Sequence, residues 1–190
     1  MTAFDTAWPI VKMPIVPDSI KRRTYTPKPA KSKHPNAWTY PWIGGGNFGN
    51  PYEQYTAKFR DPVSNEILDM QLDMENHENE RAVAQILGPE FYQMTDDEIY
   101  DDKDRGTRAS AYASASWHNK DDDSGNYRVN NLDTKEGYQR RGYATGLYDL
   151  MAHALKNRRD GFSLIPDKEQ TRAARKLWDG RDKWPVRDDL

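Results

Sequence analysis

The sequence contains no cysteine among its 190 residues. Disulfide bridges, thiol nucleophiles and thiolate metal sites are therefore excluded. The chain also lacks any apolar run near the roughly 20 residues that a membrane-spanning helix needs. Its first residues lack the apolar core of a signal peptide, because prolines and Lys12 interrupt them. These absences predict a protein that is made and used in a reducing cytoplasm, with no membrane partner.

Apolar residues are also few. They make up 36% of the chain, against the roughly 45–50% that is usual in globular domains. Aromatic residues nevertheless reach 12%, with 6 Trp and 11 Tyr, whereas disordered chains are poor in them. The composition predicts one compact domain with polar attachments.

Residues 1–50 hold seven of the 12 prolines and show no clear periodicity. Proline fixes the backbone φ angle and removes a hydrogen-bond donor, so such a stretch resists helix and central strand alike. We expect residues 1–50 to form an extended arm that lies on a partner or on its own domain, with residues 51–190 as the domain. Aromatic residues would anchor the arm, namely Trp8, Trp38, Tyr40 and Trp42.

Charge is distributed unevenly along the chain. Up to residue 50 there are seven Lys or Arg residues against two Asp, whereas residues 61–104 carry fourteen carboxylates against two basic residues. The arm and the acidic block can attract each other, within one chain or between copies, or an outside partner. A protein partner or a homo-oligomer is expected, and nucleic acid is a weaker alternative.

Two hairpins are expected in the first two thirds of the domain. Residues 52–59 and 67–74 flank an Asp-Pro turn, and the second run alternates apolar and polar residues as a half-buried strand does. Residues 111–117 and 127–132 flank a second polar turn. Between the hairpins, residues 78–87 suggest a helix, and a capping box at 95–98 suggests another.

The final third predicts a strand, a helix, a strand and a helix. From residue 143 the apolar residues recur with helical spacing, which is the clearest helix signal in the chain. Residues 162–165 are expected to form a short apolar strand. Asp167, with Gln170 three residues later, is expected to cap a last helix that ends near Trp178.

The turn at residues 139–144 carries the most chemical information. Glycine allows a close backbone approach to a ligand, and the first amides of a helix have no internal partner and carry partial positive charge. Two arginines reinforce this end, so the pattern favours an anionic ligand such as a phosphate. The residues are Gln139, Arg140, Arg141, Gly142, Tyr143 and Ala144.

This turn resembles the signature of the GNAT superfamily of acyl-CoA N-acyltransferases: Gln or Arg, two residues, Gly, one residue, then Gly or Ala. The surrounding hairpin, helix, strand and helix agree with that family over roughly residues 108–180. The resemblance implies an α+β fold with a mostly antiparallel central sheet flanked by helices. It also implies acetyl-CoA as cofactor, with the pyrophosphate on the amides of residues 140–144. The pantetheine arm would lie beside the strand at residues 127–132, in the splay between it and residues 162–165, with Leu132 among the cofactor-binding residues.

In that family an amine attacks the thioester directly, so the resemblance implies transfer of acetyl to a primary amine. A base must take the amine proton and an acid must protonate the thiolate. Glu136 is our candidate base, with Asp133 and His118 as alternatives. Trp178 stands where the family often has its tyrosine acid, so Tyr148 is our candidate for that role.

Some features depart from the family pattern. The segment before the motif is about two residues longer than usual, and only ten residues follow Gly180, where the family closes its acceptor site with another hairpin. An alternative is therefore an assembly component, for example of a phage particle, that keeps the fold with weak or no catalysis. No metal site is expected, because the polar turn at residues 121–125 lacks the ligand spacing of a calcium loop.

Overall fold

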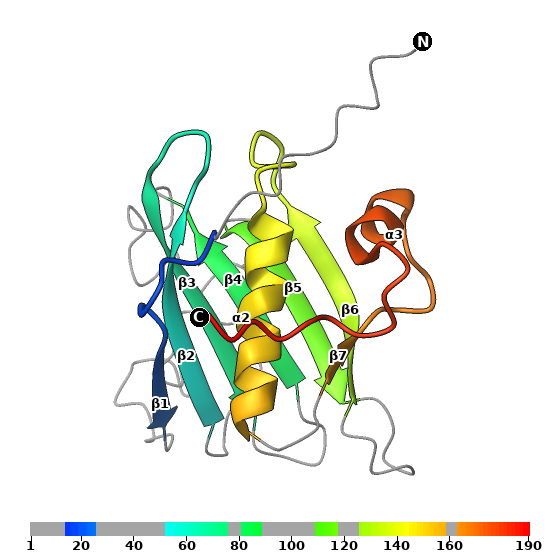
Figure 1. The fold of residues 1–190 in the computed structure, drawn as a ribbon, viewed down its shortest axis with the longest axis horizontal. Coiled ribbons are helices and arrows are strands. Elements are labelled where there is room, and N and C mark those ends of the chain that lie inside the picture. Colours follow the sequence, from blue (N-terminus) through cyan, green and yellow to red (C-terminus); the bar gives the residue numbers. More distant parts are fainter. Residues whose placement is uncertain (1–13, 26–51, 76–80, 89–108, 118–125, 159–162) are drawn as a thin grey trace, which may run out of the picture.

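The computed structural model describes residues 14–25, 52–75, 81–88, 109–117, 126–158 and 163–190 (Figure 1). In this part of the chain one seven-stranded sheet follows the order of the sequence. Its strands are β1 (Lys21–Tyr25), β2 (Tyr52–Arg60), β3 (Ile67–Glu75), β4 (Arg81–Leu87), β5 (Ala109–Trp117), β6 (Asn126–Thr134) and β7 (Ser163–Ile165). Neighbours are antiparallel except β6 and β7, which are parallel. The predicted α+β class with a mostly antiparallel sheet is confirmed.

Both predicted hairpins are present, as β2–β3 and β5–β6. A half-buried strand is predicted for residues 67–74, with its polar side chains exposed. In the structure, however, Gln71 and Asp73 on the polar side of β3 are buried. The side-chain amides of Gln54 and Gln71 donate hydrogen bonds of 3.0 and 2.9 Å to the Asp73 carboxylate. Burial is tolerated there because the carboxylate has partners.

The helix predicted for residues 78–87 is wrong, because residues 81–87 form β4, between β3 and β5. All side chains of residues 82–87 are buried. A strand covered on both faces carries apolar residues without alternation, and over so short a run this pattern is the same as that of a buried helix segment. The predicted capping box at 95–98 lies outside the described residues.

The helix predicted from residue 143 is confirmed as α2 (Tyr143–Arg158), which lies across one face of the sheet (Figure 1). Small residues beneath it allow the close approach, since Ala84 on β4 and Ala113 on β5 are fully buried. At the end of β2 the contact is closer still. A Cβ atom on Gly146 would lie 3.0 Å from the ring of Phe59, so a larger residue at this crossing would push the ring aside.

The last helix, α3 (Arg172–Trp178), begins later than predicted. Thr171 is its N-cap, with the hydroxyl accepting a 3.2 Å hydrogen bond from the amide of Ala174. Asp167 is therefore not the cap. Instead its backbone carbonyl accepts a hydrogen bond from the side chain of Gln170, 2.9 Å away, in an irregular turn after β7.

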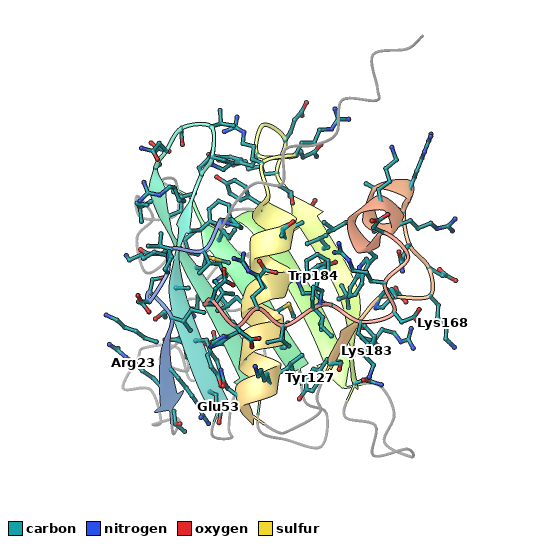
Figure 2. The ribbon with its side chains drawn as sticks, viewed as in Figure 1. Arg23, Glu53, Tyr127, Lys168, Lys183 and Trp184 are labelled. Carbon is teal, nitrogen blue, oxygen red and sulfur yellow. The ribbon has the colours of Figure 1, made fainter. Side chains whose placement is uncertain are left out.

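Part of the predicted arm belongs to the sheet. Strand β1 pairs with β2 at the sheet edge, and Ile15 is fully buried in the core beside Phe59. Lys21, Arg22 and Arg23, which lie on β1, are all exposed, and Arg23 extends away from the sheet (Figure 2). The remaining residues of the arm, 1–13 and 26–50, lie outside the described residues.

The C-terminal segment, residues 179–190, crosses the outer side of α2 (Figure 1). The amide of Trp184 donates a 2.8 Å hydrogen bond to the carbonyl of Leu164 on β7. The Trp184 side chain lies beside α2 (Figure 2), where its ring contacts those of Tyr148 and Trp178 at centroid distances of 4.9 and 5.2 Å. The segment therefore encloses α2 between itself and the sheet.

Candidate cofactor-binding loop

The loop that joins β6 to α2 has a backbone that glycine makes possible. Gly137, Arg140 and Gly142 have φ angles of 89°, 63° and 80°. Glycine adopts such values without steric cost, whereas arginine does so only when its surroundings hold it. The first bond of α2 runs from the amide of Gly146 to the carbonyl of Gly142, 2.9 Å away. Gly142 therefore turns the chain directly into the helix, as the motif predicts.

The same end of α2 suits an anion. The amides of its first turn have no intrahelical acceptor and carry the positive end of the helix dipole. No acidic residue lies in this first turn. Arg140 is exposed and the Arg141 side chain is 29% exposed, so both guanidinium groups can reach a bound anion. The loop thus combines backbone donors and positive charge at one place.

In the part of the chain that the structure describes, strand β6 has an edge next to this loop that no strand pairs with, called the open edge below. Strand β7 pairs only with residues 126–128, and β6 continues for six residues beyond that pairing. The pairing of β6 with β5 shifts at Asn130, which forms a bulge. This bulge lies two residues after Arg128, where the pairing of β6 with β7 ends. A bulge bends a strand and re-aims its edge. Half-buried Leu132 lies on this stretch, and α3 lies to its side (Figure 1).

Two side chains mark the ends of the open edge. At its start, Arg128 Nη1 donates a 3.1 Å hydrogen bond to the carbonyl of Pro166, just after β7. At its end, the Gln139 side-chain amide donates to the carbonyl of Thr134, 3.2 Å away. An extended group lying along β6 would meet backbone donors and acceptors and would arrive at the loop.

Asp61, in the β2–β3 turn, also contacts the candidate loop, whereas the sequence predicts it only as a turn residue. Its Oδ2 atom lies 2.7 Å from the Tyr143 hydroxyl and 3.3 Å from Arg141 Nη1. Burial opposes its ionisation, but hydrogen bonds from Tyr143, the turn amides and Arg141 lower the pKa of the carboxyl overall. No local pattern reveals this contact, because about eighty residues separate Asp61 from its partners.

The candidate catalytic residues have different surroundings. Glu136 is exposed on the loop, and Asp133 is exposed near the end of β6. Tyr148 is buried on α2, 5.4 Å from Trp178 between ring centroids. Burial raises the pKa of its phenol, so Tyr148 keeps its proton. His118 lies outside the described residues.

Comparison of this chain with family models, curated proteins and solved structures finds no match. The family expectation therefore depends on the residues of the motif and on their geometry. Within the described residues, no helix is both long and apolar enough to cross a membrane.

Proposed function

We propose that this chain binds acetyl-CoA through the loop of residues 139–144 and the open edge of β6. The observation that carries the proposal is the meeting of two features at one place. The start of α2, with its free amides and two arginines, is joined by the loop of residues 135–142 to a strand that, within the described residues, has no pairing with β7 beyond Arg128. A ligand with phosphates at one end and an amide-containing arm at the other matches both features.

We further propose that the bound thioester acetylates a primary amine. The amine nitrogen attacks the thioester carbonyl, a C–N bond forms, and the C–S bond breaks. Glu136 takes the amine proton, since its carboxylate is exposed beside the loop. Tyr148 holds a proton for the leaving thiolate, and donation from its buried position requires that the thiolate come close to the aromatic cluster.

A second candidate function is assembly without turnover, and one observation favours it. Tyr148 and Trp178 pack with Trp184 in an aromatic cluster, and all three side chains are buried. Under this alternative the loop keeps acetyl-CoA binding, and the arm connects the domain to a neighbouring protein or to another copy.

Thiol release separates the two candidates. The protein is incubated with acetyl-CoA and a panel of amines, including lysine peptides and small polyamines, and free CoA thiol is measured. An acetyltransferase releases thiol with an amine present, and Glu136→Gln and Tyr148→Phe each slow the release by roughly tenfold or more. Asp182→Asn, an exposed change after α3, is the control. Binding of acetyl-CoA without thiol release for any amine would favour the assembly function.

A further inference from the structure

The Asp61 carboxylate connects the β2–β3 turn to the start of α2. Its Oδ1 atom accepts hydrogen bonds from the amides of Val63 and Ser64, at 2.7 and 3.2 Å. Its Oδ2 atom accepts from the Tyr143 hydroxyl and from Arg141. The Asp61 side chain is only 2% exposed, so these four donors replace its water.

Asp61 itself is held firmly. The turn amides fix one oxygen, and Tyr143, buried at the first position of α2, fixes the other. The ring of Tyr143 also packs on Phe59, with centroids 4.5 Å apart. Because β2 ends next to Asp61, the turn and the start of the helix form one packed unit. The carboxylate therefore presents a fixed acceptor to the loop.

Arg141 is the charged partner of this carboxylate, and its side chain is 29% exposed. Its contact with Asp61 is a single long one, 3.3 Å, and its guanidinium lies over the ring of Tyr138 at 5.6 Å. The Nη1 atom of the guanidinium is thus held by Asp61, and one face of the group is covered by the ring of Tyr138. The other donors remain for a ligand, since Arg141 has five N–H groups.

We infer that Asp61 is a positioning residue for the loop of residues 139–144, and that it acts through Arg141. This inference rests on the proposed function for the identity of the ligand, though it concerns any phosphate bound at the loop. A free arginine side chain loses rotamer entropy when it binds a phosphate. Asp61 holds one nitrogen of the guanidinium beforehand and so removes part of that cost, with the group already oriented towards the ligand.

Electrostatic repulsion by Asp61 would have the opposite effect. A carboxylate close to a bound phosphate disfavours it, and Asp61→Asn would then tighten binding. Asparagine keeps the size of the side chain and an acceptor for the turn amides, so this variant tests the charge and the anchor rather than the turn. The two roles thus predict opposite signs.

The experiment is a double-mutant cycle with inorganic pyrophosphate and acetyl-CoA as probes, measured by calorimetry on the full chain. The variants are Asp61→Asn, Arg141→Gln and the double variant, with Asp69→Asn as a matched control. Asp69 lies on β3 of the same hairpin and is paired with Lys58, away from the loop. Thermal unfolding of each variant shows that it is folded.

Positioning predicts that Asp61→Asn weakens pyrophosphate binding about three- to tenfold and has almost no effect once Arg141 is Gln. Equal or tighter binding by Asp61→Asn, or an unchanged effect in the Arg141→Gln background, overturns the inference.

Pyrophosphate binding with this coupling but no acetyl-CoA binding leaves the inference standing and refutes the proposed cofactor. Acetyl-CoA binding without the coupling leaves the cofactor and refutes the inference. Absence of binding by both probes refutes both.

Discussion

The carboxylate of Asp149, on α2, accepts a 2.8 Å hydrogen bond from the indole nitrogen of Trp184, 35 residues further along the chain. Its other oxygen lies 3.3 Å from Arg187 Nη1. Burial raises the pKa of Asp149, although Trp184 and Arg187 act against that rise. The C-terminal segment is thus attached to the helix that carries the candidate loop.

Asp149→Ala is expected to destabilise the fold by about 2–4 kcal/mol, because it leaves a buried indole N–H and an arginine without their acceptor. Chemical denaturation measures the change. Asp188→Ala is the control, since that residue pairs with Lys156 at an exposed position and such pairs contribute little. Equal stability of the two variants would mean that the segment does not hold α2.

Asp73 makes stability depend on pH. Burial raises the pKa of its carboxyl to about 7, although the amides of Gln71 and Gln54 act to lower it. In the unfolded chain an aspartate has a pKa near 3.9. Between roughly pH 4 and 7 the folded state therefore binds a proton that the unfolded state has lost, and stability falls as pH rises.

The effect of Asp73 alone is isolated by subtracting the stability of Asp73→Asn from that of the wild type at each pH. That difference should fall by up to roughly 1.4 kcal/mol per pH unit between pH 4.5 and 6.5 and level off above about pH 7.5. Denaturant titrations across this range supply the values. A difference that is flat with pH would show that the carboxyl is not buried as described.

Gly146→Ala is expected to destabilise the protein, although alanine is favoured over glycine in a helix by about 1 kcal/mol. The new Cβ atom would lie 3.0 Å from two carbons of the Phe59 ring, and overpacking of this kind costs about 1–3 kcal/mol. Phe59→Leu is the partner substitution. Gly146→Ala should lower the free energy of unfolding by less in the Phe59→Leu background than in the wild type, as measured by chemical denaturation. An equal loss in both backgrounds would show that the new Cβ atom does not clash with Phe59.

Arg140→Asn should weaken pyrophosphate binding several-fold and change stability little. Asparagine tolerates the positive φ of this position, so the loop keeps its shape and loses one positive charge. Arg23→Asn removes the same charge at the sheet edge, where Figure 2 shows Arg23 extending outward. If the two variants bind pyrophosphate equally, net charge and not the loop determines binding.

The sequence alone predicts the structural elements that depend on residues close together in the chain. The two hairpins, the helix from residue 143 and the Gly142 turn each follow from a short pattern. Strand β4 was mistaken for a helix because a short strand buried on both faces has no alternation. The late cap at Thr171 was missed because Asp167 and Gln170 have the same spacing as a capping box.

The tertiary contacts of the site were not predictable in this way. Asp61 reads as an ordinary turn residue, and only folding places it beside Arg141. The C-terminal segment, residues 179–190, is mostly polar and carries one tryptophan, yet Trp184 is buried against α2. A lone aromatic residue in a charged segment was the one available signal that the segment packs on the domain.

The central claim is that the loop at the start of α2 binds acetyl-CoA, and calorimetric titration of the full chain tests it most directly. Wild-type protein is compared with Gly142→Glu, which places a side chain and a negative charge where phosphate would lie. Gly180→Glu is the matched control, because it makes the same change at another glycine of positive φ, after α3. We predict micromolar binding by the wild type and by Gly180→Glu, and loss of binding in Gly142→Glu. Binding that survives in Gly142→Glu, or no binding by the folded wild type, would contradict the account.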